Sequence, residues 1–309
     1  MSSLCAARVA LAALVLAVAA GCDDPLKEVE RIESVRVLGA RVEVQGDAER
    51  AAPAPGERAS VRWLVVAPTE PVALGWSLGV CLARENNLGL SSCAEPPFAQ
   101  LEQTEPSVDA PTIEFAVPAS IDPQATPRLA LLGVICPDGS PEGSLDEARC
   151  TGEDPGTAVS LELELARPGD VNANPGFAEP ALALDGEEWP DVLVTSAPCA
   201  GEGLLEIAAG SPRHLVRVDV RQDARDPLPQ VIEDDPLREE LRISHFSTDG
   251  GFTRAFSALA ADDPGSSVQV PWDAPATAPE GGQLARFWFV LRDLRGGSSF
   301  VSRALCVVP

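Results

Sequence analysis

The sequence predicts an all-β protein of two tandem β-sandwich domains that follow a cleaved N-terminal signal peptide. Short runs of alternating apolar and polar residues recur along the chain, and turns rich in proline and glycine separate them. Pro and Gly number 29 and 25 among 309 residues. Residues 168–176 begin and end with a Pro-Gly dipeptide and hold no apolar run, which is typical of a linker between domains.

The first 21 residues have the pattern of an export signal. Arg8 precedes an apolar run over residues 9–21, which is too short to cross a bilayer, since a spanning helix needs about 20 residues. The run ends in Ala19-Ala20-Gly21-Cys22, which resembles the lipobox of bacterial lipoproteins. That resemblance implies that Cys22 carries the lipid and begins the mature chain. The alternative is an ordinary secretory peptide cut after Ala17-Val18-Ala19.

Lipidation of Cys22 would fix the protein to a membrane. Each buried CH₂ group contributes about 0.8 kcal/mol, and a cysteine with several acyl chains anchors far more firmly than one chain does. Residues 22–32 are then the lipidated cysteine and a polar tether. We expect a protein anchored to the outer or inner membrane of a Gram-negative bacterium, facing the periplasm or the cell surface.

The first sandwich is expected over residues 33–167. Its cleanest alternation is Val159-Ser-Leu-Glu-Leu-Glu-Leu165, which is the pattern of a half-buried strand. The strand spacing and Trp76 in the third strand resemble an immunoglobulin-like domain. The expected strands cover residues 33–44, 59–67, 72–81, 113–117, 128–136 and 159–165.

The second sandwich is expected over residues 177–309. An aromatic strand, an Asp-x-x-Gly-Gly turn at 293–297 and a closing strand resemble the end of immunoglobulin-like or PKD-like modules. The two halves share no fixed sequence period, so duplication stays unproven. The expected strands cover residues 182–186, 214–220, 240–246, 285–291 and 300–308.

Six cysteines remain once Cys5 leaves with the signal and Cys22 takes the lipid, and an even number in an exported chain predicts disulfides. If the strands that end near Cys81 and Cys136 are antiparallel neighbours, these two cysteines lie at opposite ends of the sheet and cannot pair. Local pairs are therefore favoured. They are Cys81 with Cys93 and Cys136 with Cys150, while Cys199 and Cys306 either pair or stay free.

Charge and motifs exclude several function classes. The formal net charge of −24 repels phosphate backbones, so we expect no nucleic-acid partner. No C-x-x-C pair is present to hold zinc, and no G-x-S-x-G, H-E-x-x-H or P-loop occurs. We expect no catalytic residues, no metal and no cofactor, and hence no enzyme. Ser244, His245 and Asp249 are close in sequence, but adjacent strand residues face opposite ways, so we expect His245 to be a partly exposed strand-end residue.

The whole mature chain resembles the disulfide-bearing, two-domain envelope lipoproteins of high-GC Gram-negative bacteria. This resemblance implies a non-enzymatic binding or scaffold module whose partner is an envelope protein or a glycan. One alternative is a glycan-acting hydrolase or carbohydrate-binding protein with Trp189, Trp272 and Trp288 as a stacking platform. Another is an adhesion module stabilised by calcium in the acidic loops at 137–142, 152–155, 232–236 and 261–264.

Overall fold

The computed structural model describes residues 29–69, 71–84, 91–125, 128–167, 172–192, 198–225, 227–232 and 235–309. Their regular structure is β throughout, apart from one 3₁₀ turn, η1 (Leu145–Glu147). The all-β sandwich class expected from the alternating pattern is therefore confirmed. None of the described helices is long and apolar enough to cross a membrane.

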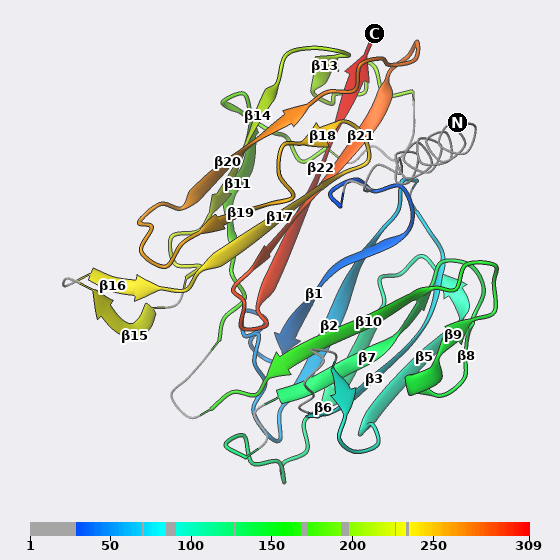
Figure 1. Ribbon diagram of the computed structural model, residues 1–309, viewed down its shortest axis with the longest axis vertical. Coiled ribbons are helices and arrows are strands. Elements are labelled where there is room, and N and C mark those ends of the chain that lie inside the picture. Colours follow the sequence, from blue (N-terminus) through cyan, green and yellow to red (C-terminus); the bar gives the residue numbers. More distant parts are fainter. Residues whose placement is uncertain are drawn as a thin grey trace, which may run out of the picture.

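The first sandwich packs a three-stranded sheet, in the order β1-β2-β6, against a five-stranded sheet, in the order β10-β7-β3-β4 with β5 also paired to β3 (Figure 1). The three-stranded sheet comprises β1 (Arg36–Val44), β2 (Arg58–Val66) and β6 (Thr112–Ala116). The five-stranded sheet comprises β3 (Leu74–Arg84), β4 (Ser92–Cys93), β5 (Ala99–Ser107), β7 (Arg128–Cys136) and β10 (Thr157–Glu164). A small ribbon adds β8 (Pro141–Glu142) and β9 (Arg149–Cys150).

The second sandwich packs a sheet in the order β12-β11-β14-β20-β18 against one in the order β13-β22-β21-β17-β19. The first of these comprises β11 (Phe177–Leu184), β12 (Glu187–Glu188), β14 (His214–Val220), β18 (Gly251–Phe252) and β20 (Ser267–Asp273). The other comprises β13 (Glu206–Ala208), β17 (Leu241–Ser247), β19 (Phe256–Leu259), β21 (Gln283–Arg292) and β22 (Ser298–Val308). A separate ribbon holds β15 (Pro227–Ile232) and β16 (Asp235–Arg238).

The two sandwiches repeat one strand order. β1, β2 and β6 form one sheet of the first sandwich, and β11, β14 and β20 form the corresponding path in the second. In the facing sheets, the path β10-β7-β3-β5 corresponds to β22-β21-β17-β19. Each sandwich has seven strands on these two paths. Numbered along the chain, strands one, two and five form one sheet, and strands seven, six, three and four form the other. This is an immunoglobulin-like order. The two halves of the chain share no fixed sequence period, but their strands are connected in the same order.

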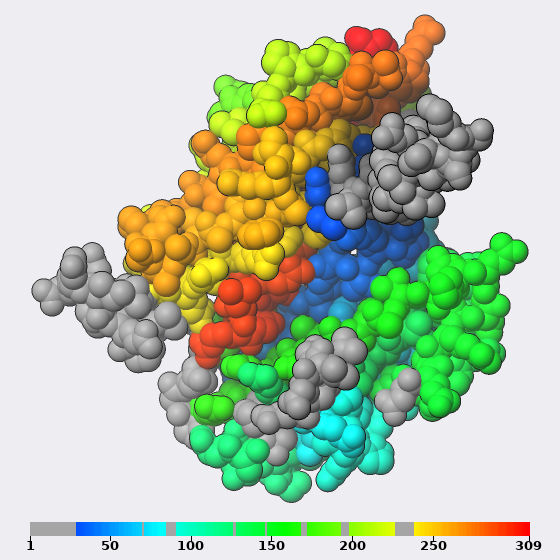
Figure 2. All heavy atoms as spheres, in the orientation of Figure 1, coloured from blue at the N-terminus to red at the C-terminus, as the bar shows by residue number. Residues whose placement is uncertain are grey.

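The sandwiches stack into four layers because two strands are apolar on both faces. On β21, Phe287 and Phe289 enter the core of the second sandwich, while Trp288 and Val290 point the other way. On β2, Trp63 faces the core of the first sandwich. The outward residues form an interface cluster between β1-β2 and the sheet of β21. Figures 1 and 2 show the blue and red parts of the chain side by side where the two sandwiches meet. Its members are Ile32, Leu38, Leu64, Val66, Phe246, Trp288, Val290 and Phe300.

The C-terminal end of the expected tether, residues 22–32, is part of the folded protein. Ile32 is buried in the interface cluster. Its N–H donates to Ser247 O at 2.9 Å, and Ser247 N–H donates to Glu30 O at 3.0 Å, so the chain lies beside β17. The boundary segment behaves similarly, because Asn172 and Asn174 are buried and pair with residues 49–51.

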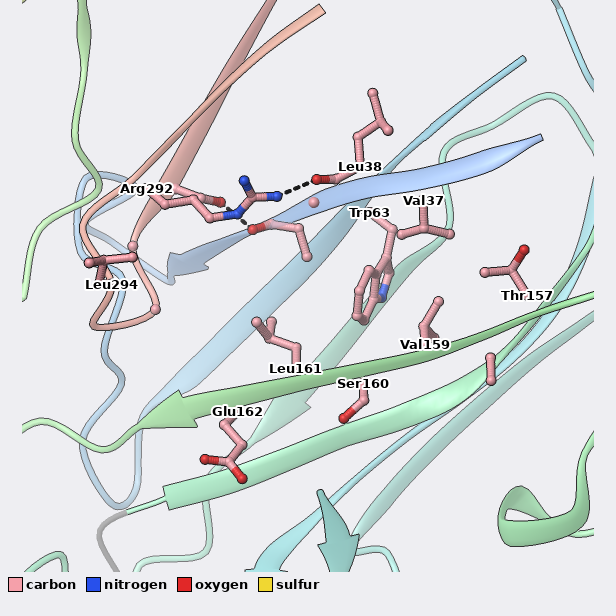
Figure 3. Close-up of a pocket in the computed structure, with 16 residues that line it drawn as sticks. Val37, Leu38, Trp63, Thr157, Val159, Ser160, Leu161, Glu162, Arg292 and Leu294 are labelled. Atoms are coloured by element: carbon pink, nitrogen blue, oxygen red, sulfur yellow. Dashed lines mark hydrogen bonds between the residues drawn. The ribbon is translucent and has the colours of Figure 1, made fainter. Parts of the chain in front are cut away.

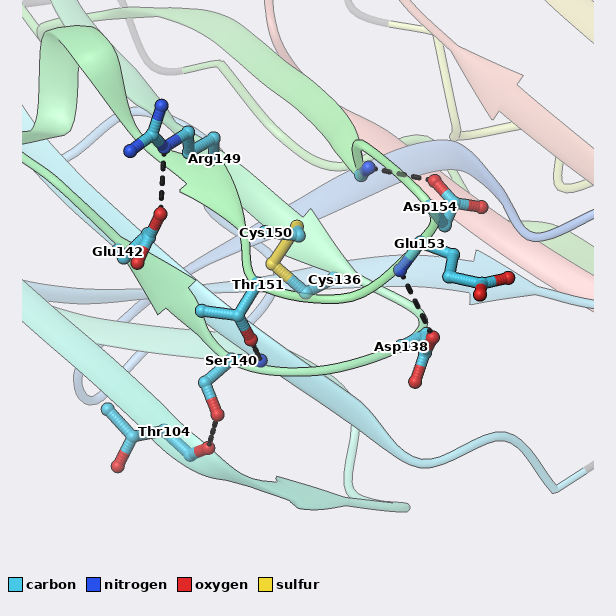
Figure 4. The surroundings of a disulfide bond; sticks show 11 residues. Thr104, Cys136, Asp138, Ser140, Glu142, Arg149, Cys150, Thr151, Glu153 and Asp154 are labelled. Atoms are coloured by element: carbon cyan, nitrogen blue, oxygen red, sulfur yellow. Dashed lines mark hydrogen bonds and ion pairs between the residues drawn. A yellow bond between two sulfur atoms is a disulfide. The ribbon is translucent and has the colours of Figure 1, made fainter.

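Three disulfides join the six expected cysteines. The pairs Cys81–Cys93, Cys136–Cys150 and Cys199–Cys306 have Cα separations of 5.5, 5.5 and 5.6 Å. β3 and β7 are antiparallel neighbours with Gly75 opposite Cys136 and Cys81 opposite Ala130, so the local pairings follow from the register. Figure 4 shows Cys136–Cys150 joining the end of β7 to the β8-β9 ribbon.

Some strands differ from the expectation. β20 is not among the expected strands. Val268, Val270 and Trp272 alternate into the core, but Pro271 is unusual in a central strand because it lacks an N–H. The structure tolerates Pro271 where it lies opposite Leu215 on β14. β5 also escaped prediction, because its side chains are mostly exposed on both faces and leave no periodic signal.

The disulfides should contribute unequally to the free energy of unfolding, because they close loops of different length. Cys81–Cys93 spans 12 residues and Cys199–Cys306 spans 107. In the chain-entropy model such loops contribute about 3 and about 4.7 kcal/mol to the free energy of unfolding. We expect Cys199→Ala/Cys306→Ala to lower the urea-derived free energy of unfolding more than Cys81→Ala/Cys93→Ala does. The 14-residue pair Cys136–Cys150 is the matched control, and a smaller loss for the long loop would contradict this account.

Candidate functional site

The lipidation residue expected from the sequence, Cys22, lies outside the described residues, together with the rest of residues 1–28. The six cysteines expected to form disulfides are all paired. The described part of the chain therefore offers no free thiol. It also contains no group of three or more His, Cys, Asp or Glu residues that could hold a metal ion.

A cavity of about 450 Å³ lies where the two sandwiches meet (Figure 3). One wall is the start of β1, from Val37 to Ala40, and the opposite wall is β10, from Thr157 to Glu162. The turn between β21 and β22 closes one side, and the indole of Trp63 projects between the walls. The volume is within the range of small-molecule sites.

The wall formed by β1 is an edge strand whose carbonyls are covered by side chains. β1 pairs with β2 on one side, so alternate carbonyls point to the other side. Three successive outward carbonyls each accept a hydrogen bond from a residue beyond position 171. The pairs are Arg292 Nη2 to Leu38 O, Ser298 Oγ to Ala40 O, and Asn174 Nδ2 to Val42 O at 2.6 Å.

Asn174 joins both sandwiches through one buried amide. Its Nδ2 donates to Val42 O, and its Oδ1 accepts the N–H of Ser298 at 3.0 Å. The side chain is almost completely buried, so both bonds are shielded from water. Without Asn174, Val42 O and the N–H of Ser298 would lose this partner, and a buried backbone group without a partner costs about 1–3 kcal/mol. Asn174 therefore stabilises the contact between β1 and β22.

The Asp-x-x-Gly-Gly turn shapes the third side of the cavity. Asp293 Oδ1 accepts the N–H groups of Arg295 and Gly297 at 2.8 and 2.9 Å. A Cβ at Gly297 would lie 2.2 Å from Asp293 Oδ2, and Gly296 has φ of +110°, so both positions favour glycine. Burial raises the pKa of the Asp293 carboxyl, and these hydrogen bonds oppose the rise.

The lining of the cavity does not match what glycan hydrolysis needs. Trp63 Nε1 is buried and has no hydrogen-bond partner among the described residues. Glu162 is the one carboxylate of the lining, and it pairs with Arg128 at 3.2 Å. A glycosidase needs two carboxylates about 5–10 Å apart, which this lining does not supply.

The tryptophan platform of the glycan alternative is wrong. Trp189, Trp272 and Trp288 are 1%, 0% and 4% exposed, so none can stack on a sugar. Trp189 Nε1 donates to Ala304 O, and Trp272 Nε1 donates to Asp249 O, each at 3.1 Å. Their indoles fill cores, as large aromatic side chains in sandwiches usually do.

The acidic loops that are described act as turn caps. Asp154 Oδ1 accepts the N–H of Gly156 at 2.8 Å, and Asp138 Oδ2 accepts the N–H of Glu153 at 3.4 Å (Figure 4). Asp263 Oδ1 binds the N–H of Gly265 in the same way at 2.7 Å. Asp154 and Asp263 thus bind amides of their own loops, and Asp138 binds an amide of the neighbouring acidic loop.

Ser244, His245 and Asp249 do not form a unit, as the alternation of strand residues predicts. His245 is nevertheless fully buried, against the expectation of a partly exposed histidine, because it enters the core between Phe252 and Phe289. Ser244 faces the other way and accepts a hydrogen bond from Arg292 Nη1 at 3.1 Å. Burial lowers the pKa of His245 from 6.5 to about 4.

A second Ser-His-Asp set, which sequence reasoning missed, does come together at one end of the second sandwich. Ser211 Oγ lies 2.7 Å from His214 Nε2, and Asp185 Oδ2 lies 2.6 Å from His214 Nδ1. The N–H of Leu215 donates to the other oxygen of Asp185 at 2.7 Å. This is the arrangement of nucleophile, base and orienting carboxylate found in serine hydrolases.

Two turns bring these residues together. Asp185 and Gly186, with φ of 52° and 92°, form the two-residue loop between β11 and β12, where both positions need positive φ. The register of β11 on β14 then sets Asp185 beside Leu215. Ser211 lies in a turn closed by its own N–H on Ala208 O at 3.1 Å, three residues before His214. The Asp-Gly dipeptide after an apolar run was a usable hairpin signal.

Comparison with known proteins identifies no family for this chain. No protein family and no curated protein matches the sequence. Among solved structures, the Yersinia pseudotuberculosis adhesin InvE is similar over 86% of this chain and 58% of its own, at 9% identity and a TM-score of 0.21. A Salmonella alpha-2-macroglobulin variant is similar over 91% of this chain and 17% of its own, at 12% identity and a TM-score of 0.23. This chain thus spans less than two thirds of either protein, and likenesses with such low scores carry no argument about its fold or its function.

The buried His245 makes stability depend on pH. Because its pKa is about 4 in the folded protein and 6.5 ordinarily, the unfolded chain binds the proton first as the pH falls. The free energy of unfolding is therefore at its full value above pH 6.5 and decreases towards pH 4, by up to about 3 kcal/mol.

The measurement is urea unfolding between pH 7 and 4 for the wild type and His245→Phe. Phenylalanine cannot titrate, and its neighbours Phe252 and Phe289 are also apolar. We expect the wild type to lose stability relative to the variant as the pH falls. A difference between the two proteins that stays constant with pH would contradict the assignment.

Proposed function

We propose that this protein is a lipid-anchored component of the bacterial cell envelope, whose paired sandwiches act as a binding or scaffold module. The observation that carries this proposal is the export signal that ends in Ala19-Ala20-Gly21-Cys22. A lipid on Cys22 would hold the folded part at a membrane through residues 23–28.

The disulfides support a location outside the cytoplasm. The described residues form three disulfides. Disulfides form and persist in oxidising compartments and are rare in the reducing cytoplasm. Together with the β-sandwich fold, they describe a non-cytoplasmic, β-rich module. The attachment to an outer or inner membrane and the orientation towards the periplasm or the cell surface belong to the proposal.

The interface between the sandwiches supports a scaffold role. The apolar cluster around Trp288 and the covered edge of β1 join two domains that a flexible linker would otherwise leave independent. A stiff pair of domains presents a fixed surface, which lowers the ordering cost of binding a partner.

The proposed partner is an envelope protein or a glycan, and nucleic acid is disfavoured by the net charge of −24. The cavity between β1 and β10 is a candidate place for a ligand group, because it lies where the two sandwiches meet and its volume of about 450 Å³ is within the range of small-molecule sites. The proposed principal role of the protein is to bind a partner, not to catalyse a reaction.

The anchor is tested with labelled palmitate in the cells that make the protein. We expect label in the wild type and in Cys5→Ala, because Cys5 leaves with the signal peptide, and none in Cys22→Ala. The Cys22→Ala protein should also move from the membrane fraction to the soluble fraction. Palmitate incorporation that persists in Cys22→Ala would contradict the anchor. Crosslinking in intact cells that captures no partner on the wild-type protein would count against the binding role.

A further inference from the structure

We propose that Ser211, His214 and Asp185 form a hydrolytic triad, with Ser211 as the nucleophile towards acyl esters. This inference is independent of the lipid anchor and adds an activity to the scaffold role. It rests on two hydrogen bonds that join a hydroxyl, an imidazole and a carboxylate in series, at 2.7 and 2.6 Å.

The carboxylate fixes the direction of proton transfer. Burial disfavours the charged form of Asp185, but hydrogen bonds from His214 and from the N–H of Leu215 outweigh it and lower the pKa of the carboxyl. An ionised carboxylate can only accept, so the hydrogen of His214 must be on Nδ1. The lone pair of Nε2 then faces Ser211 Oγ, which is the tautomer that a general base requires.

The surroundings hold the imidazole and leave the hydroxyl accessible. The side chain of His214 is 12% exposed and lies over Trp272, with the ring centroids 6.0 Å apart. Ser211 is half-buried in a surface turn, and both following residues, Pro212 and Arg213, are exposed. Among the described contacts, Ser211 Oγ bonds with His214 alone. A substrate that approaches this oxygen would therefore displace no other hydrogen-bond partner.

The reaction that this geometry supports is ester hydrolysis in two steps. Ser211 Oγ attacks the acyl carbon while His214 Nε2 takes the hydroxyl proton, and the tetrahedral intermediate then expels the alcohol, which receives that proton. Water next attacks the acyl-Ser211 ester, giving its proton to His214. The carboxylic acid leaves, and the proton on His214 returns to Ser211 Oγ, so the protein is regenerated.

Stabilisation of the oxyanion sets the expected rate and substrate. Pro212 follows the nucleophile and has no N–H, so the backbone donor that often follows a catalytic serine is missing. Arg213 is the nearest cation in sequence, and Asp273 holds it at 3.1 Å. Because one preorganised donor contributes about a factor of 10²–10³ to the rate, the site should be slow and should favour activated esters of small acids.

The experiment uses the full chain and two probes, a fluorophosphonate that phosphorylates activated serines, and p-nitrophenyl acetate. The composition suits both probes, because the chain has no tyrosine, and Lys27 is its only lysine. Mass spectrometry locates the fluorophosphonate adduct. The variants are Ser211→Ala, His214→Gln and Asp185→Asn, with Ser140→Ala as a surface-serine control whose hydroxyl binds Thr104 O.

We expect the adduct on Ser211 in the wild type and in Ser140→Ala, and none at that position in Ser211→Ala. Hydrolysis of p-nitrophenyl acetate should fall at least about tenfold in Ser211→Ala and His214→Gln, and less in Asp185→Asn. Melting temperatures show whether each variant is folded, and Ser211→Ala removes only a hydroxyl. A wild type that gives no Ser211 adduct, or one that hydrolyses ester no faster than folded Ser211→Ala, would overturn the proposal. If folded His214→Gln were labelled at the wild-type rate, His214 would not activate Ser211, and the proposed triad would be wrong.

Discussion

The covered edge of β1 is the constraint on which the arrangement of this molecule depends. An edge strand exposes a row of unpaired carbonyls, and buried polar groups must find partners. Here Leu38, Ala40 and Val42 find theirs on the second sandwich and on the segment that leads into it. The edge is thereby covered by side chains and not by another strand. The same contacts fix the position of one sandwich on the other.

The interface has an apolar and a polar half with different roles. The cluster around Trp288 and Val290 removes apolar surface from water, which stabilises contact without specifying its geometry. The hydrogen bonds of Asn174 are directional, so they fix the register of β22 against β1. The cavity beside Trp63 exists because the turn held by Asp293 meets the free edge of β10 there. A change in the interface would therefore change the cavity.

The sequence predicts well what depends on local periodicity. β10 and β14 follow directly from alternating residues, and two disulfides follow from the opposite directions of β3 and β7. It predicts poorly what depends on contacts between distant segments. Asn174 is unremarkable in sequence, and only the structure shows it buried between sandwiches. Asp185 is 29 residues from His214, and the two meet only because an Asp-Gly turn and a strand register place them together. The depth at which His245 is buried was also hidden, since it depends on which face of β17 meets the core.

Because of this interface, the two sandwiches should unfold as one body. Hydrogen exchange under increasing urea, read by mass spectrometry, reports the stability of each strand separately. We expect peptides from β1-β2 and from β21-β22 to lose protection at the same urea concentration in the wild type. In Asn174→Ala, which leaves Val42 O and Ser298 N without this partner, the shared transition should move to lower urea. The free energy of unfolding should fall by about 2–6 kcal/mol, since each buried group without a partner costs about 1–3 kcal/mol. Separate transitions for the two sandwiches in the wild type, with no effect of Asn174→Ala on either, would contradict this expectation.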